Sequence, residues 1–184
     1  MKLTPSGSQT VGPYFRIGLQ HLCDSDAQRA ADVDTVTVHG TVIDANGVPV
    51  SDAMLEIWHA DRDGRYDAGL PDASGRPACF TRAATDDEGS FRFTIVRPGA
   101  VPGESGIRQA PHIAVLVFAR GLLRHLITRM YFPDEAANSS DPVLQSIPEK
   151  RRRTLIAERD SHRPGTLEWN VVLQGDDETV FFAW

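Results

Sequence analysis

The sequence is poor in cysteine and in long apolar runs. Its 184 residues include two cysteines, Cys23 and Cys79, which lie far apart and outside a CxxC spacing. We expect two reduced thiols, with a single disulfide between them as the alternative. No apolar run approaches the roughly 20 residues that cross a bilayer, and no apolar segment behind Lys2 indicates a signal peptide. These absences predict a cytoplasmic protein.

Basic residues are fewer than acidic ones. The net charge of −6 does not favour nucleic acid or an anionic membrane as a partner, because both attract basic surfaces. The sequence contains no phosphate loop, no GxGxxG, no nucleophile elbow and no HExxH, so the commonest nucleotide-binding, hydrolase and zinc-peptidase classes are not indicated. With 41% hydrophobic and 8% aromatic residues, the chain has the composition of one globular domain, residues 1–184.

The sequence does contain a succession of short strand patterns. Thr35–Ile43 alternates β-branched with small or polar residues, and Asn46–Gly47 after it is a strong turn signal. In Ser90–Val96, apolar side chains recur at every second position and share one face. The predicted strands are 35–43, 53–58, 90–96, 112–118, 123–132, 167–173 and 179–182, the last two forming a terminal hairpin. Roughly seven to nine strands at this spacing predict an all-β fold, an antiparallel β-sandwich with long loops and one or two short helices.

Three other segments do not show a strand pattern. Ser146–Glu158 begins with helix start signals and predicts the one clear helix, and its basic run, Lys150–Arg153, is typical of a solvated helix face. Residues 67–85 contain proline and glycine and are expected to be a long loop that makes functional or structural contacts. Residues 22–34 are polar and alanine-rich, which suits either a helix or a loose connection. The large side chains expected in the core are Trp58, Phe91, Phe93 and Trp169.

His112 stands out among the six scattered histidines because of its setting in a predicted strand. Positions i and i+2 of a strand point to the same face, so a His-x-His pair there would present two imidazoles to one metal ion. The second position of such a pair is Ala114 in this chain. His112 alone cannot hold a metal ion.

Several sequence blocks together resemble the intradiol ring-cleavage dioxygenases. The blocks fall in family order and span nearly the whole chain, which makes the match more specific than any single motif. They are Thr4–Ser6, Ser8–Phe15, Gly40–Asp44, Gly47–Val50, Ala53–Asp61, Gly64–Tyr66, Thr85–Gly89, Arg97–Gly99, Pro111–Ile113 and Arg129–Phe132.

The resemblance implies a ferric site that this chain has partly lost. Family members bind Fe(III) through two tyrosines and two histidines, and anionic tyrosinate oxygens suit this hard cation. Tyr66 and His112 match the first tyrosine and the first histidine. Val101 and Ala114 stand where the other two ligands belong, and Gln109 stands where family enzymes carry an arginine. One phenol and one imidazole leave the ion's charge uncompensated, so we expect no metal and no catalytic residue in this chain.

Within the family, this pattern resembles the iron-free α type of subunit, which pairs with a homologous iron-bearing β subunit. The resemblance implies that Fe(III) is held by the β subunit, that αβ units form a higher-order oligomer, and that protocatechuate and O2 are converted to 3-carboxy-cis,cis-muconate. It also implies that Gly12, Pro13, Tyr14 and Arg120 line the substrate pocket at the α/β interface. Residues 1–34 would form an N-terminal arm that contacts the partner, and residues 35–184 the sandwich.

Other interpretations stay open at this point. Arg120 suits a surface arginine in a tight turn as well as a ligand for the substrate's carboxylate, and Gly12–Pro13 suits an arm that only anchors the partner. The chain as a whole could be a ligand-binding or scaffold β-sandwich module without a catalytic assembly. An intradiol enzyme with its own iron, acting on catechol or hydroxyquinol, is disfavoured by Val101 and Ala114.

Overall fold

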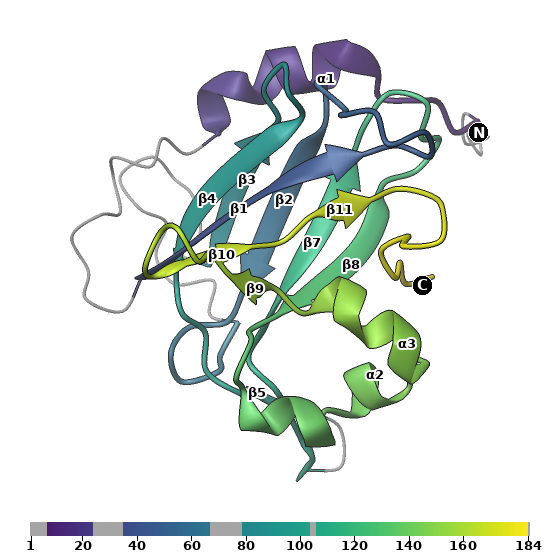
Figure 1. Cartoon of the computed structure of the whole chain (residues 1–184). Coiled ribbons are helices and arrows are strands. Elements are labelled where there is room, and N and C mark those ends of the chain that lie inside the picture. The colour runs from purple at the N-terminus through teal and green to yellow at the C-terminus, as the bar shows by residue number, and fades with distance from the viewer. Residues whose placement is uncertain (1–6, 24–34, 67–78, 104–105, 184) are drawn as a thin grey trace, which may run out of the picture.

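Two β-sheets packed face to face form the body of the molecule (Figure 1). This computed structural model describes residues 7–23, 35–66, 79–103 and 106–183. Helix α1 (Gly12–Leu19) lies at one end of the sandwich, while α2 (Pro142–Gln145) and α3 (Glu149–Arg152) lie at the opposite end (Figure 1). The predicted β-sandwich is therefore confirmed. Within the described ranges, no helix is long and apolar enough to cross a membrane.

The first sheet is organised around β1 (Thr35–Ile43). This strand pairs antiparallel with β4 (Ser90–Val96) and parallel with both β10 (Thr166–Glu168) and β11 (Val171–Val172). The edge strand β9 (Glu158–Arg159) continues the sheet beyond β10. The two parallel pairs make this sheet mixed, whereas the remaining strand pairs named here are antiparallel as the sequence predicts.

A close approach between neighbouring chains explains one glycine in β1. A Cβ atom added at Gly40 would lie 1.8 Å from the backbone oxygen of Trp169, far inside any van der Waals contact. The Trp169 amide donates a hydrogen bond to the His39 carbonyl at 2.9 Å. Only glycine therefore allows the chain between β10 and β11 to pass so near to β1.

The second sheet is fully antiparallel and has the order β3–β2–β7–β8. Its strands are β3 (Phe80–Ala84), β2 (Met54–His59), β7 (His112–Phe118) and β8 (Leu126–Tyr131). In β7 the side chains of Ile113, Val115 and Val117 are fully buried, while their neighbours in sequence point to the other face. This alternation fixes the register and carries His112 and Ala114 together to the face outside the core.

The core between the sheets is mostly aliphatic and aromatic. Phe91, Phe93 and Ile95 of β4 are buried on one face, as predicted, and Trp169 lies edge-on to Phe91. The prediction for Trp58 is wrong, because this side chain is 39% exposed. Position 58 of β2 points to the outer face, where the indole ring packs against Phe80 at 4.4 Å between centroids.

The single helix predicted at Ser146–Glu158 is wrong. The segment instead follows α2 and contains the short helix α3, a 3-10 turn at Arg153–Leu155 and the first residue of strand β9. Pro148 is the N-cap of α3 and has a ψ of 132°, outside the helical range. Proline disfavours a helical conformation at the residue before it and has no N–H for a helix hydrogen bond, so a continuous helix does not form across this position. A further 3-10 segment at Ala136–Ser140 precedes α2.

Two other predictions are corrected. The predicted terminal hairpin is wrong, because Phe182 forms a bridge with Ile127 of β8 in the opposite sheet. The end of the chain thus crosses from one sheet to the other. The predicted loop 67–85 contains strand β3 in its last part, where Phe80–Ala84 alternates after a proline- and glycine-rich stretch. Residues 67–78 and 24–34 lie outside the described part of the chain.

Candidate functional site

The phenol of Tyr66 and the imidazole of His112 lie in direct contact. The Tyr66 hydroxyl is 3.2 Å from Nε2 of His112. The other ring nitrogen, Nδ1, lies 2.7 Å from the Ala110 carbonyl oxygen, which can only accept, so Nδ1 carries the proton. Nε2 then accepts from the Tyr66 hydroxyl. Tyr66 and His112 thus satisfy each other as a neutral hydrogen-bonded pair.

A tight turn brings Tyr66 toward this position. Asp61 accepts hydrogen bonds from the Asp63 and Arg65 amides through Oδ1, and Gly64 has a φ of +80°. A Cβ at Gly64 would lie 1.9 Å from the Ala100 oxygen. Glycine therefore serves both the left-handed backbone angle and the close packing of the turn next to β5 (Val101–Pro102).

Arg129 of β8 lies beside the Tyr66–His112 pair. It is paired in register with Ala114, the position at which the family resemblance predicts a second histidine in iron-binding members. Its Nη1 donates to Oε1 of Gln109 at 2.7 Å and to the Tyr131 hydroxyl at 3.4 Å. The Arg129 guanidinium therefore lies beside the two residues that the family resemblance predicts as metal ligands.

The charge of Arg129 and burial set the protonation of the pair. Burial, followed by the guanidinium of Arg129, lowers the pKa of His112 to about 4. Burial raises the pKa of Tyr66, while Arg129 opposes this increase. The whole Tyr66 residue is 49% exposed, yet its hydroxyl end is the part against His112. Both groups are neutral near pH 7, and neither offers the anionic oxygen that Fe(III) prefers.

The buried carboxylate of Asp141 accepts hydrogen bonds from residues next to the Tyr66–His112 pair. Asp141 is fully buried and accepts hydrogen bonds from the Ala110 amide at 2.8 Å, the Leu144 amide at 2.7 Å and the Tyr131 hydroxyl at 3.0 Å. The Leu144 bond caps the N-terminus of α2. Burial raises the pKa of Tyr131, so this hydroxyl stays a donor. Asp141 thereby joins α2, β8 and the segment before β7.

The residues present do not fit a ferric site. Val101 is buried in β5 and pairs with Gln109 of β6 (Arg108–Gln109), but neither its side chain nor that of Ala114 has a donor atom. In the part of the chain that the structure describes, no group of three or more His, Cys, Asp or Glu side chains could hold a metal ion. No disulfide joins Cys23 and Cys79.

The other four predicted site residues lie at the opposite end of β7. His112 begins that strand, and Arg120 follows its end, so six strand steps of about 3.4 Å put roughly 20 Å between the two regions. Gly12, Pro13 and Tyr14 form the first turn of α1. The geometry thus separates the predicted site residues into a Tyr66–His112 region and an α1–Arg120 region.

The α1–Arg120 region is held together by contacts between distant segments. The Gly121 amide donates to Oγ1 of Thr10 at 2.8 Å, which ties the turn after β7 to the chain before α1. Phe15 packs on Phe118 with ring centroids 5.0 Å apart, and Arg16 donates to the Thr85 carbonyl at 2.6 Å. The N-terminal arm and the Arg120 turn are therefore neighbours, as a shared pocket requires.

The α1–Arg120 region presents both charge and apolar surface. The Arg120 side chain is 66% exposed, and its Nε lies 3.2 Å from Oδ2 of Asp52, a side chain only 10% exposed. Tyr14 is 81% exposed and Ile17 is 56% exposed. An exposed guanidinium next to exposed apolar side chains suits contact with an anionic aromatic ligand and with a protein partner.

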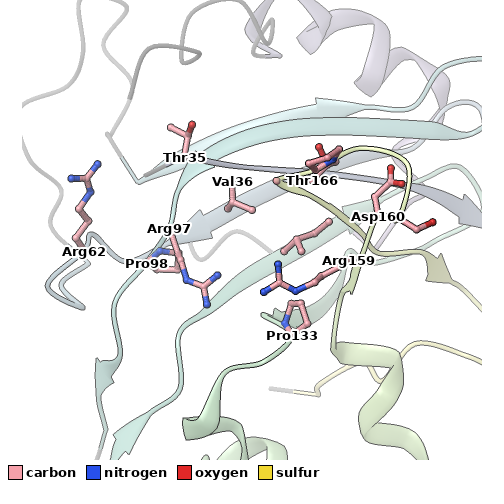
Figure 2. A pocket seen from close by; sticks show the side chains of 13 residues that line it. Thr35, Val36, Arg62, Arg97, Pro98, Pro133, Arg159, Asp160 and Thr166 are labelled. Carbon is pink, nitrogen blue, oxygen red and sulfur yellow. The ribbon is translucent and has the colours of Figure 1, made fainter. Parts of the chain in front are cut away.

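A further cavity does not include the residues of these two regions. It has a volume of about 760 Å³ and is lined by apolar residues that include Val36 and Leu167 together with Arg62, Arg97 and Arg159. Figure 2 shows Arg97 and Arg159 near one another and Arg62 apart from them. Arg97 pairs with Glu135 at 3.3 Å and Arg159 with Asp134 at 2.6 Å. These two arginines are paired within the chain, as Arg120 is with Asp52, so ion pairing alone does not rank the cavity against Arg120 as an anion site.

Sequence reasoning missed Asp52 and the role of Arg129. Arg129 lay inside a block that matches the family, and its register opposite Ala114 becomes visible only when β7 and β8 are paired. Asp52 lies in the turn before β2, far in sequence from Arg120. No local pattern in the sequence signals either contact.

A family model and several known proteins are similar to this chain. A family model described as "Dioxygenase" matches residues 12–175. The protocatechuate 3,4-dioxygenase alpha chain of Burkholderia cepacia is 43% identical over 99% of this chain and 98% of its own length. The alpha chain of Pseudomonas putida is 38% identical over 98% and 96%. The beta chain of B. cepacia is 31% identical over 94% of this chain and 77% of its own length.

A solved structure shares the fold over most of both chains. The dioxygenase domain of a dioxygenase carbohydrate-binding protein fusion from Streptomyces sp. SirexAA-E superimposes with a TM-score of 0.61 and 24% identity, covering 97% of this chain and 93% of that one. At this identity, the likeness supports the fold. The family model and the relatives show that the chain belongs to the intradiol dioxygenase family.

Proposed function

We propose that this chain is the iron-free α subunit of a protocatechuate 3,4-dioxygenase. In that role it pairs with a homologous β subunit that holds Fe(III), and the complex cleaves protocatechuate with O2 to 3-carboxy-cis,cis-muconate. Both atoms of O2 enter the product, and the ring opens between the two carbons that carry hydroxyl groups. The assembly would contain several αβ units, with residues 1–34 as the arm that contacts the β subunit.

The observation that carries the proposal is the state of the Tyr66–His112 region. The frame of a family metal site is kept, but two ligand positions hold Val101 and Ala114. The two remaining ligands bond to each other at 3.2 Å. A family member built in this way needs a partner chain for its chemistry. Near full-length similarity to an alpha chain at 43% identity supports the same assignment.

The chain's own contribution would come from the α1–Arg120 region. Gly12 has a φ of +64°, which glycine adopts without strain, and it opens the helix that presents Tyr14. Arg120 is exposed and able to bind the carboxylate of protocatechuate through its guanidinium. The roughly 20 Å between this region and His112 supports a pocket that is shared with the partner's iron rather than one built on this chain's former site.

Coexpression tests the proposal. The chain is produced with a homologous β chain and also alone, and ring cleavage and iron content are measured in each preparation. We expect cleavage and one iron per αβ unit in the complex, and neither activity nor stoichiometric iron in the lone chain. Stoichiometric iron with a tyrosinate-to-iron absorption band in the lone chain would contradict the proposal. Failure to copurify any β chain would favour a scaffold or ligand-binding module.

A substitution at Arg120 tests the proposed pocket. In the complex, Arg120→Ala should raise the KM for protocatechuate by about 10- to 100-fold, because a charge-assisted bond to the carboxylate is lost. Arg153→Ala, an exposed arginine directly after α3 at the opposite end of the molecule (Figure 1), serves as the control and should leave the KM unchanged. An unchanged KM in Arg120→Ala would remove Arg120 from the pocket but not the subunit assignment.

A further inference from the structure

The carboxylate of Asp52 is in an unusual position for a charged group. Its side chain is only 10% exposed, and it lies in the turn that precedes β2. Neither of its oxygens receives a hydrogen bond of good geometry among the described residues. A buried carboxylate without such bonds is costly unless a positive charge compensates it. Within the described ranges, Arg120 is the cation that lies within ion-pair distance, at 3.2 Å.

The contact uses one particular edge of the Arg120 guanidinium. Nε lies 3.2 Å from Oδ2 of Asp52 without hydrogen-bond geometry, so the contact is electrostatic and leaves the N–H donors of the guanidinium available for another acceptor. A guanidinium carries five N–H donors in a rigid plane, and attraction to the buried carboxylate keeps this plane close to Asp52. The side chain is nonetheless 66% exposed, which leaves those donors accessible to a ligand.

The backbone of the same turn is fixed from the other side. Gly121 has a φ of +84°, and its amide is bonded to Thr10 just before α1. The Arg120 main chain is therefore held by the N-terminal arm, while its side chain is held by Asp52. Without the second contact, a long and largely exposed arginine side chain would sample many rotamers.

We propose that Asp52 is a positioning residue for Arg120 and thereby a determinant of specificity for substrates that carry a carboxylate. This inference rests on the proposed function and extends it to a residue that does not itself touch the substrate. Asp52 attracts the guanidinium of Arg120, and the N–H donors of that group receive the substrate's carboxylate. The guanidinium is shared between two carboxylates, one buried and one bound, so it does not leave Asp52 uncompensated when substrate binds.

The test uses the αβ complex and two substrates. Asp52→Asn keeps the shape of the side chain but removes the charge that orients Arg120. We expect the KM for protocatechuate to rise about 5- to 10-fold, with kcat within about twofold. The KM for catechol, which has no carboxylate, should not change. Asp52→Glu keeps a carboxylate on a side chain that is one methylene longer. Its KM for protocatechuate should rise less than that of Asp52→Asn.

A double-mutant cycle separates positioning from a structural role. In an Arg120→Ala background, Asp52→Asn should have no further effect on the KM, because the group that it positions is gone. Arg120→Lys provides an independent variant at an exposed site: it keeps the charge but has no Nε, and we expect a KM increase like that of Asp52→Asn. The melting temperature of each complex is measured alongside.

Several outcomes would overturn the inference. Equal losses on protocatechuate and catechol would indicate a structural role for Asp52, and additive effects in the cycle would show that it acts without Arg120. A lower KM for protocatechuate in Asp52→Asn would mean that Asp52 only weakens the attraction of Arg120 for the substrate's carboxylate. In each case the wild-type complex still cleaves protocatechuate, so the proposed function stands. If the wild-type complex cleaves nothing, the proposed function fails and the inference falls with it.

Discussion

At the residue scale, the Tyr66–His112 region has two features that disfavour a bound cation. Tyr66 and His112 form a neutral pair, and Arg129 brings a fixed positive charge next to it. A cation entering this space meets electrostatic repulsion in addition to a poor ligand set. Restoring the two lost ligand types would therefore not be sufficient to restore metal binding.

Adding ligands with and without Arg129 tests this reasoning. The double variant Val101→Tyr with Ala114→His should bind less than about one tenth of an equivalent of Fe(III), since repulsion by one charge at close range costs more than 1.4 kcal/mol, a factor of ten in affinity. Adding Arg129→Gln should raise the iron content measurably and introduce a tyrosinate-to-iron absorption band. Equal iron in the double and triple variants would show that Arg129 does not exclude the metal.

The lowered pKa of His112 predicts how stability depends on pH. The imidazole titrates near pH 6.5 in the unfolded chain and at about 4 in the folded one. Between these values the unfolded state binds more protons, so stability falls as the pH drops from 6.5 toward 4, by as much as about 3 kcal/mol. Denaturant unfolding as a function of pH should show this loss in the wild type and a flatter profile in His112→Gln.

Exposed His162 supplies the control for the pH experiment. Because carboxylates also titrate in part of this range, the relevant quantity is the difference between each variant and the wild type. His162→Gln should retain the wild-type profile. A His112→Gln variant whose stability falls just as steeply would show that other groups account for the loss.

At the element scale, Asp141 joins α2 to the second sheet. It accepts from two backbone amides and from the Tyr131 hydroxyl, and an asparagine would direct an amide N–H₂ at one of these donors. Asp141→Asn should lower the free energy of unfolding by about 2 to 4 kcal/mol. Asp177→Asn, which breaks an exposed ion pair with Arg153, should cost about 1 kcal/mol or less. Similar losses in the two variants would contradict the joining role of Asp141.

The same scale shows which features the sequence could predict. The strands 35–43, 90–96 and 112–118 match β1, β4 and β7 because one face of each is buried and the period of two is clear. The helix predicted at 146–158 is too long, because Pro148 interrupts it and α3 begins only after this proline. The terminal hairpin failed because Phe182 pairs with Ile127 across the sandwich, and local patterns carry no information about such long-range pairing.

The candidate site divides in a similar way. The family blocks predict Tyr66 and His112 as retained ligand positions and Val101 and Ala114 as replaced ones, and the structure brings Tyr66 and His112 into contact. The Arg129 and Asp52 contacts depend on which strands and turns become neighbours in space. The register of β7 with β8 and the path of the turn before β2 decide these contacts, and neither is encoded in a short segment.

At the scale of the whole molecule, α1 has two faces with different tasks. Phe15 packs inward on Phe118, while Tyr14 and Ile17 are exposed on the other side. Exposed apolar side chains next to a candidate ligand site mark a partner surface. We expect the outward face of α1 to be buried when the chain joins its assembly.

Replacing Ile17 by a charged residue tests this surface. Ile17 is 56% exposed in the chain, so Ile17→Glu should change the stability of the lone chain by about 0.5 kcal/mol or less. In an apolar interface, however, the same carboxylate would be buried without a partner, and association with the β chain should weaken at least about tenfold. Lys150→Glu on α3, at the opposite end of the molecule (Figure 1), should leave association unchanged. If Ile17→Glu and Lys150→Glu associate equally well by sedimentation or titration calorimetry, the β chain does not bind over the outward face of α1, and the arm must contact it by another route.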